Sequence, residues 1–238
     1  YKHFSDTVSA YATLSYESKS GERYPQDVKD PLKAVYIEAG LDYKKLSLHT
    51  RYNETQLDEF LNLAGYSKQN QHTSDNTFIG IKYNWLNTDK FKLDSHYSYS
   101  KHAISTAGLI AEFDDMPDFL LGPDWQTSDS KFSTELSYQL DNQWQLAAGV
   151  EYAEAKQQKA DVRTNYYDSD SQQVILAPAY YQNGIVRIKD FPLFASLKYT
   201  FETVSAYGQL KIPFSDSFTF FIGARYDDVK DIDSKLSP

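Results

Sequence analysis

Two stretches of the sequence concentrate aromatic and arginine side chains of the kinds that bind small ligands. The first, "EFDDMPDFLLGPDWQ" at residues 112–126, is too apolar for an idle surface loop, and residues 156–203 combine tyrosine pairs with arginines. Guanidinium groups form charge-assisted hydrogen bonds with carboxylates and catecholates, and aromatic rings stack on flat groups. We therefore predict that residues of these two stretches bind a ligand, namely Phe113, Phe119, Trp125, Arg163, Tyr166, Tyr167, Tyr180, Tyr181 and Arg187.

A structural role for the same stretches is the alternative. Large loops must bury apolar side chains to stay ordered, so residues 112–126 could pack on neighbouring loops. Residues 156–203 could form a hairpin that turns at Asn183–Gly184. Both alternatives are compatible with ligand binding.

The sequence contains no strong motif for a catalytic, cofactor or metal site. The sequence has no cysteine, Gly-x-Ser-x-Gly, phosphate-binding loop or His-Glu-x-x-His motif, so we predict neither enzyme activity, nor a cofactor, nor a metal centre. His49 and His96 are interpreted as hydrogen-bonded polar residues rather than ligands of a metal or haem. The acids at Asp168, Asp170 and 227–233 fit solvated loops better than a calcium site.

Composition excludes several classes of protein. The formal charge of −9 disfavours nucleic acid and anionic lipid as partners. No segment approaches the roughly 18 consecutive apolar residues of a membrane-spanning helix. The 20 tyrosines outnumber the 14 phenylalanines and 3 tryptophans together, and rings with a polar tip suit surfaces where an apolar phase meets water.

Period-two alternation of apolar and polar residues dominates the chain and must position these side chains. It predicts an all-β fold of nine strands. These strands are Thr7–Glu17, Lys33–Tyr43, Leu46–Glu54, Thr77–Trp85, Phe91–Lys101, Phe132–Leu140, Gln143–Ala155, Val204–Ile212 and Ser217–Asp228.

The connections between these strands alternate in length. Four are tight turns, at Lys44–Lys45, Leu86–Lys90, Asp141–Asn142 and Pro213–Asp216. The others are long, at about 18–32, 55–76, 102–131 and 156–203, with a short helix predicted over Thr55–Ala64. Up-and-down hairpins with all long loops at one end are typical of a transmembrane β-barrel, whereas a soluble meander is the alternative.

Aromatic residues recur on the apolar face in pairs eight residues apart, a separation of about 26 Å along a strand. A strand tilt of about 40° reduces this to about 20 Å, close to the apolar band of about 25 Å that aromatic girdles flank. The expected membrane-interface aromatics are Phe91, Tyr99, Trp144, Tyr152, Phe218 and Tyr226.

The opposite face of the strands is charged and hydroxylated. Charges in a dry core are costly unless paired, whereas a wide barrel can hydrate them or pair them with an enclosed domain. Its predicted members are Glu38, Asp42, His49, Arg51, Lys82, Lys92, Asp94, His96, Glu135, Glu151, Lys211, Arg225 and Asp227.

The C-terminal stretch "SAYGQLKIPFSDSFTFFIGARYDDVK" at 205–230, with the following Leu236–Pro238, resembles part of the TonB-dependent outer-membrane receptors. In that family two strands and a short turn end in Gly-x-Arg-Tyr-Asp, as Gly223–Asp227 does here. Gly40–Glu54 and Trp144–Tyr152 are similar to other hairpins of such barrels.

The resemblance implies a barrel of about 22 strands in the outer membrane of a Gram-negative bacterium, enclosing a plug domain that contacts TonB. Because no plug or TonB box is recognisable and nine strands are an odd number, we expect the chain to be an internal fragment of the barrel. The implied function is uptake of a scarce ligand, with a ferric siderophore favoured over haem, cobalamin or an oligosaccharide. A passive porin or structural barrel is the alternative, and a barrel enzyme is a weaker one.

Overall fold

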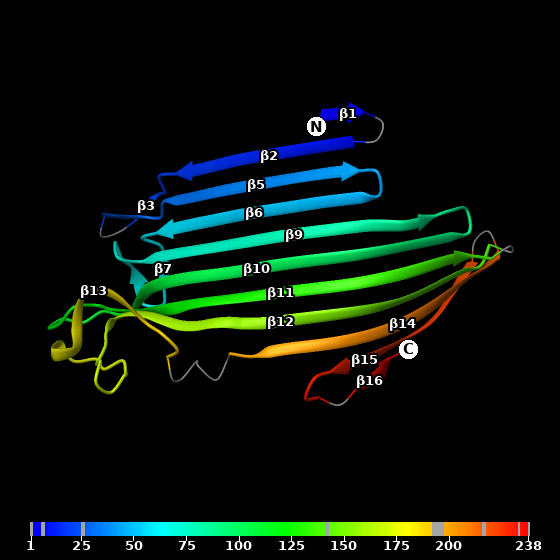
Figure 1. Ribbon diagram of the computed structural model, residues 1–238. Helices are drawn as coiled ribbons and strands as arrows, with labels where there is room; N and C mark the ends of the chain where they lie inside the picture. The colour runs from blue at the N-terminus through cyan, green and yellow to red at the C-terminus, as the bar shows by residue number, and fades with distance from the viewer. Residues whose placement is uncertain are drawn as a thin grey trace.

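Alternating side chains along almost every segment produce one large antiparallel sheet (Figure 1). The computed structural model describes residues 2–5, 8–24, 27–140, 143–191, 198–215, 218–232 and 234–237. Neighbouring strands follow in the order β1-β2-β5-β6-β9-β10-β11-β12-β14-β15-β16, and β13 pairs with β12 off this path. Up-and-down order of this kind needs only hairpin connections.

The strands of this sheet differ widely in length. Two small hairpins, β3–β4 and β7–β8, lie beside one end of the sheet, and a short 3-10 helix, η2, precedes β13 (Figure 1). The bounds are β1 Lys2–Ser5, β2 Val8–Lys19, β3 Arg23–Tyr24, β4 Val28–Lys29, β5 Leu32–Tyr43, β6 Leu46–Asp58, β7 Leu61–Asn62, β8 Gly65–Tyr66, β9 Gln71–Asn87, β10 Phe91–Ala111, β11 Phe119–Gln139, β12 Gln145–Tyr166, η2 Pro178–Tyr180, β13 Tyr181–Ile188, β14 Thr200–Ser215, β15 Phe218–Val229 and β16 Lys235–Ser237.

The all-β prediction is confirmed, and the nine predicted strands are β2, β5, β6, β9, β10, β11, β12, β14 and β15. The tight turns at Lys44–Lys45 and around Thr88 are also present, between β5 and β6 and between β9 and β10. The predicted turn Asp141–Asn142, with Thr7, Asp216, Ser217, Asp233 and Pro238, lies outside the described residues.

The predicted long loops are shorter than expected, and the bounds given for 102–131 are wrong. β10 and β11 remain paired through that range, with Ile104 opposite Trp125, and only residues 112–118 connect them. β12 and β9 likewise extend into the predicted loops 156–203 and 55–76. The sequence analysis ended the strands where apolar alternation weakened, whereas backbone pairing continues with polar side chains.

Two local predictions are wrong for the same reason. The helix over Thr55–Ala64 is absent, because β6 continues to Asp58 in register with β9 and the chain then turns through Glu59, whose φ is 55°, into β7 and β8. The turn at Asn183–Gly184 is absent because both residues lie within β13, where its register with β12 shifts. Pairing with a neighbouring strand overrides these local signals.

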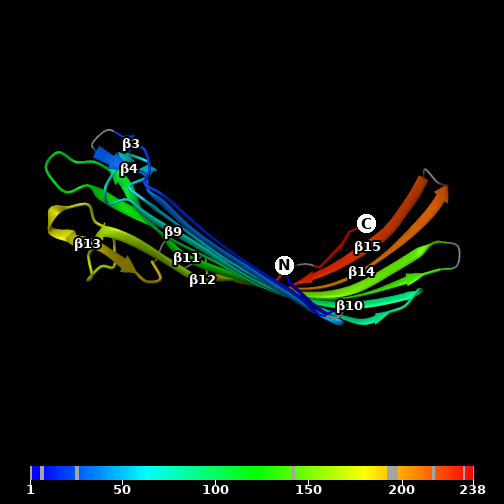
Figure 2. The ribbon, with the colours of Figure 1, turned by 90° about the horizontal axis from the view of Figure 1, so that it is seen from above.

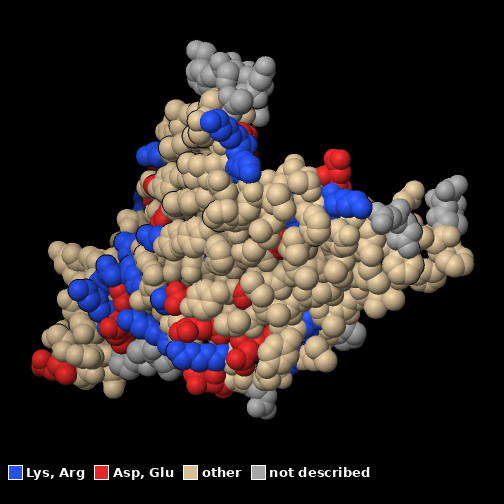
Figure 3. All heavy atoms as spheres, turned by 45° about the vertical axis from the view of Figure 1, so that its right-hand side comes forward, with Lys and Arg blue, Asp and Glu red and all other residues tan. Residues whose placement is uncertain are grey.

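The two faces of the sheet differ sharply in chemistry. One register row runs across seven strands on the apolar face, and all its members are at least 37% exposed. They are Leu41, Leu48, Ile81, Tyr97, Phe132, Tyr152 and Val204. Figure 3 shows a broad uncharged area with charged residues toward its margins.

The adjacent register row, one residue along each strand, lies on the opposite face and is polar. Its members are Ser9, Asp42, Ser47, Lys82, His96, Ser133, Glu151, Ser205 and Asp227. Figure 2 shows the main strands as one twisted, curved layer. The alternation read from the sequence therefore separates two real faces.

Buried side chains gather at the end of the sheet opposite the short turns, on the left in Figure 1. There β10, β11 and β12 extend beside β13 and the two small hairpins. The buried apolar residues are Val28, Ala107, Leu109, Phe119, Leu120, Ala160, Val162, Tyr166 and Ile188. We call this part of the molecule the outer extension.

Within the described residues, no helix is both long and apolar enough to cross a membrane.

Candidate functional site

A network of charged side chains covers the polar face of β12, β14 and β15. Arg225 lies at its centre: its Nη2 is 3.1 Å from Glu151 Oε1 and its Nε is 2.8 Å from Asp227 Oδ1. Arg225 Nη2 also donates to Ser205 Oγ at 2.9 Å, and Lys131 Nζ lies 2.5 Å from the other oxygen of Glu151. These groups lie beside a cavity of about 740 Å³ on the same face.

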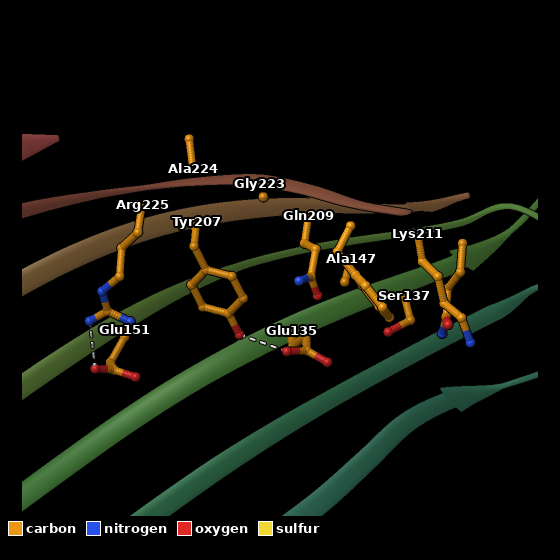
Figure 4. A pocket seen from close by; sticks show the side chains of 13 residues that line it. Glu135, Ser137, Ala147, Glu151, Tyr207, Gln209, Lys211, Gly223, Ala224 and Arg225 are labelled. Carbon is orange, nitrogen blue, oxygen red and sulfur yellow. Dashed lines mark hydrogen bonds and ion pairs between the residues drawn. The ribbon is translucent and has the colours of Figure 1, made fainter. Parts of the chain in front are cut away.

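Strand register brings these side chains together. Ser205 is opposite both Glu151 and Asp227, and Tyr207 is opposite Arg225. In Figure 4, Arg225, Tyr207 and Glu151 project to one side of the sheet while Ala224 points to the other. Because side chains alternate between the two faces along each strand, residues two apart in the sequence lie on the same polar surface.

A glycine opposite Tyr207 lets its ring lie flat across the sheet. A Cβ on Gly149 would lie 2.5 Å from the ring's Cζ and from its hydroxyl oxygen, so any other residue here would force the ring to shift. The ring can therefore reach over β12 to β11, where its hydroxyl donates to Glu135 Oε2 at 2.7 Å (Figure 4). Gly40 has the same relation to the ring of Tyr11, whose hydroxyl donates to Glu38 Oε1 at 3.0 Å.

The polar face continues across the other strands with two further carboxylate clusters. Glu38 accepts hydrogen bonds from Tyr11 and Tyr36 and lies 3.0 Å from His49 Nε2. Asp94 accepts from Asn84 at 2.7 Å and lies 3.2 Å from Lys92 Nζ and 3.7 Å from Lys82 Nζ.

Paired charges of this kind suit a wetted surface or contact with another polar surface. His49 is held by Glu38, and it lines a small cavity together with His96. Within the described residues no group of three or more histidine or acidic side chains is placed to hold a metal ion. The arrangement offers hydrogen bonds and charge to a bound partner.

A second charge cluster ties β13 to the outer extension, on the face opposite the polar network. Arg187 Nη2 lies 2.6 Å from Asp161 Oδ2, and its Nε lies 3.0 Å from Asp124 Oδ2. Burial raises the pKa of the Asp161 carboxyl, but the Asp190 backbone N–H and the Arg187 guanidinium lower it more, so the net pKa falls below its usual range. The carboxylate form thus stabilises this connection.

Two buried asparagines complete the backbone pairing of the outer extension. Asn165 accepts from the Leu120 N–H at 2.8 Å and donates to the Asp118 carbonyl at 2.8 Å. Asn70 accepts from the Leu109 N–H at 2.7 Å and donates to the Phe60 carbonyl at 2.6 Å. Each amide replaces a missing strand neighbour, which is what buried backbone groups require.

The structure places the predicted ligand-binding residues in different environments. Phe119 and Tyr166 are buried and contact each other edge to face, with centroids 6.0 Å apart, and Tyr181 packs on Tyr166. The Tyr167 N–H donates to the Tyr180 carbonyl at 2.9 Å. These five residues form a packed region.

Of the other four predicted residues, Arg187 is exposed, whereas Arg163, Phe113 and Trp125 are half-buried. Arg163 donates to Gln71 Oε1 at 3.1 Å, and Arg187 is an exposed partner of Asp161 and Asp124. Phe113 and Trp125 line two separate cavities. The nine residues therefore do not converge on one pocket, and a role for each in binding stays a prediction.

An apolar cavity of about 310 Å³, not predicted from the sequence, lies on the polar face of the outer extension. Trp125 lines it together with Leu63, Ile110, Leu121, Pro123 and Val162. Alternation does continue through this range, as Ile104, Thr106, Ile110, Leu121 and Trp125 share a face, and this signal could have revealed the cavity. It was obscured by assigning residues 102–131 to a loop.

The predicted membrane-interface aromatics lie at the surface. Phe91, Tyr152, Phe218 and Tyr226 are exposed, while Tyr99 and Trp144 are half-buried. Phe91 stacks on Tyr138 with centroids 4.5 Å apart. Their contact with a membrane interface stays a prediction.

This fold and these faces define an antiparallel up-and-down sheet of the kind that forms β-barrels. The family model described as "TonB dependent receptor-like, beta-barrel" matches residues 2–238, and the chain belongs to this family. No curated protein matches the chain.

A similar solved structure is titled "Structure of the RagAB peptide importer in the 'closed-closed' state". Its TM-score is 0.57 at 12% sequence identity, with 98% of this chain covered. The likeness therefore concerns the fold. This chain spans 32% of the length of that chain.

Proposed function

We propose that the chain forms part of the wall of an outer-membrane receptor of a Gram-negative bacterium, which takes up a scarce extracellular ligand with energy delivered through TonB. Two adjacent register rows carry this proposal: one exposes large apolar side chains on seven strands, and the next places polar side chains on the other face. Lipid on one side and water, or an enclosed plug domain, on the other would satisfy both rows.

The two ends of the sheet differ in a way that supports one orientation of the chain across the proposed outer membrane. The end with the short turns at Lys44–Lys45 and Thr88–Lys90 would face the periplasm, and the outer extension would face the cell exterior, as brief periplasmic turns and large extracellular loops do in such barrels. A ligand would then meet the outer extension first and the charged polar face afterwards.

For the ligand, two classes have support. The family resemblance favours a ferric siderophore, and the solved neighbour is a peptide importer. The family is one of receptors and transporters rather than of enzymes.

Energy coupling distinguishes this proposal from a passive porin. In cells expressing the full-length protein, we expect uptake of a radiolabelled ligand to stop when a protonophore collapses the proton-motive force, while surface binding persists. A strain that lacks the gene should lose both. Uptake that continues at an unchanged rate after protonophore treatment would instead establish passive diffusion through a porin.

A further inference from the structure

The cavity beside Trp125 is an apolar site in a surface that is otherwise polar. Its lining residues Ile110, Leu121 and Val162 continue the same strand face that carries His96, Ser133 and Glu151 farther along the sheet. The β7–β8 hairpin closes one side of it. There the side chain of Asn62 lies against Gly108, and the Ala64 N–H donates to the Leu109 carbonyl at 3.3 Å.

Leu63, at the tip of this hairpin, lines the cavity and is 84% exposed. An exposed leucine alone is ordinary, but here it stands beside five other apolar or aromatic lining residues. Filling the cavity with an apolar group would remove this surface from water and stabilise the complex.

Acidic side chains border the same hairpin. Glu112, Asp114 and Asp118 line the neighbouring cavity with Tyr66 and Lys68 of the hairpin segment. Glu112 comes two residues after Ile110, about 7 Å along the chain, and its Oε1 would be 3.7 Å from a Cβ on Gly65.

These carboxylates are available to a cationic ligand. Within the described chain, the ion pairs closer than 4.0 Å do not include the acids of residues 112–118. With three carboxylates against the single ammonium group of Lys68, this second cavity attracts positive charge and repels a ligand with net negative charge.

We propose that this site binds a short peptide, with a bulky apolar side chain in the cavity beside Trp125 and a cationic group against Glu112, Asp114 and Asp118. This inference rests on the proposed uptake function and specifies its ligand. Binding would occur in the outer extension before the ligand passes along the charged polar face.

Calorimetric titration of the purified full-length protein in detergent tests the ligand chemistry. The probe is a tetrapeptide amide of lysine, glycine, leucine and glycine, in that order. Replacing its leucine with serine should weaken binding about tenfold, because roughly 1.5 kcal/mol or more of apolar burial is lost. Replacing its lysine with glutamate should also weaken binding about tenfold.

Matched variants test the location. Leu63→Ser should weaken binding of the leucine peptide about tenfold while leaving the serine peptide unchanged. Leu61→Ser is the control, since Leu61 lies in the same hairpin, is 61% exposed and does not line the cavity. Its affinity should equal that of the wild type.

The inference would be overturned by equal affinity for the leucine and serine peptides, by equal effects of Leu63→Ser and Leu61→Ser, or by tighter binding of a ferric tris-catecholate than of any peptide. Failure to bind any of the peptides would overturn it as well. The protonophore experiment judges energy-coupled uptake separately, so the receptor proposal can survive any of these results.

Discussion

The middle of the sheet and the outer extension differ in where their apolar side chains lie, although both include parts of β10, β11 and β12. In the middle, large apolar side chains such as Val150 and Ile222 are 55% and 62% exposed. In the outer extension, Leu109 and Tyr166 are completely buried, and buried asparagines complete the backbone pairing. One part keeps its apolar surface outside, whereas the other folds around a small core.

In the proposed barrel wall, this difference would correspond to two solvents along the same strands. Exposed apolar rows suit contact with lipid, while a buried core with satisfied polar groups suits water. In the proposed barrel, a strand that leaves the bilayer would exchange lipid contact for protein contact, which the two hairpins and β13 would supply.

Truncating the core of the outer extension should have the largest effect. Leu109→Ala should destabilise the outer extension by about 2 to 5 kcal/mol, because a fully buried leucine leaves a cavity. Hydrogen exchange should rise in the ends of β10 and β11 while the middle of both strands stays protected. Unchanged exchange at these ends would show that the core does not hold the extension together.

A charge on the apolar face should cost slightly less. Val150→Lys should destabilise the full-length protein in lipid vesicles by about 2 to 4 kcal/mol near the bilayer midplane, as measured by urea unfolding. Ala147→Lys is the matched control on the polar face of the same strand, beside Ser137 and Gln209, and should cost far less. Equal costs at both positions would remove the distinction between the faces.

Removing a buried amide should have an intermediate effect confined to the outer extension. Asn165→Ala leaves the Leu120 N–H and the Asp118 carbonyl without a partner and should cost about 1 to 3 kcal/mol. Asn183→Ala, at an exposed position in β13, should change stability by less than about 0.5 kcal/mol. Limited proteolysis of residues 112–118 reports the difference, and similar cleavage of the two variants would contradict it.

Acid should loosen the outer extension in two steps. Burial and, to a lesser extent, the nearby His102 hold the pKa of His72 below its ordinary 6.5, so the unfolded state takes up a proton first and stability falls as the pH drops below about 6.5. The pKa of Asp161 is also below its ordinary 3.8, which adds a second loss below about that pH.

Two substitutions assign these steps in hydrogen exchange measured against pH. His72→Asn should abolish the upper step and Asp161→Asn the lower one. A pH profile that neither substitution alters would show that other groups govern the acid response.

The middle of the sheet and the outer extension also differ in how much of their structure can be predicted from the sequence. In the middle of the sheet, alternation from Val8 to Tyr16 or from Phe218 to Tyr226 predicts both the strand and its face, because each side chain meets one of two distinct environments. In the outer extension the determinants are contacts between distant segments, such as Asn165 with Leu120 and Asn70 with Leu109. Such contacts leave no periodic signal.

The candidate site shows the same limit. Arg225 and Glu151 were placed on the polar face from alternation alone, but their ion pair depends on register between β12, β14 and β15. Tyr166 was predicted to bind a ligand because of its type, whereas its burial depends on β13 folding back onto β12. Residue type identifies candidates, and tertiary pairing decides which of them stay accessible.

Site-directed spin labelling tests most directly whether the two faces meet different solvents. These 238 residues contain no cysteine. Single cysteines are placed at Val150 and Ile222 on one face and at Ala147 and Gln209 on the other, in full-length protein in lipid vesicles from which any cysteine outside these residues has been removed. Labels at the first pair should collide mainly with oxygen dissolved in lipid, and labels at the second pair with a water-soluble nickel chelate. Equal collision rates with the nickel chelate at all four positions would contradict the proposal that the sheet is a barrel wall.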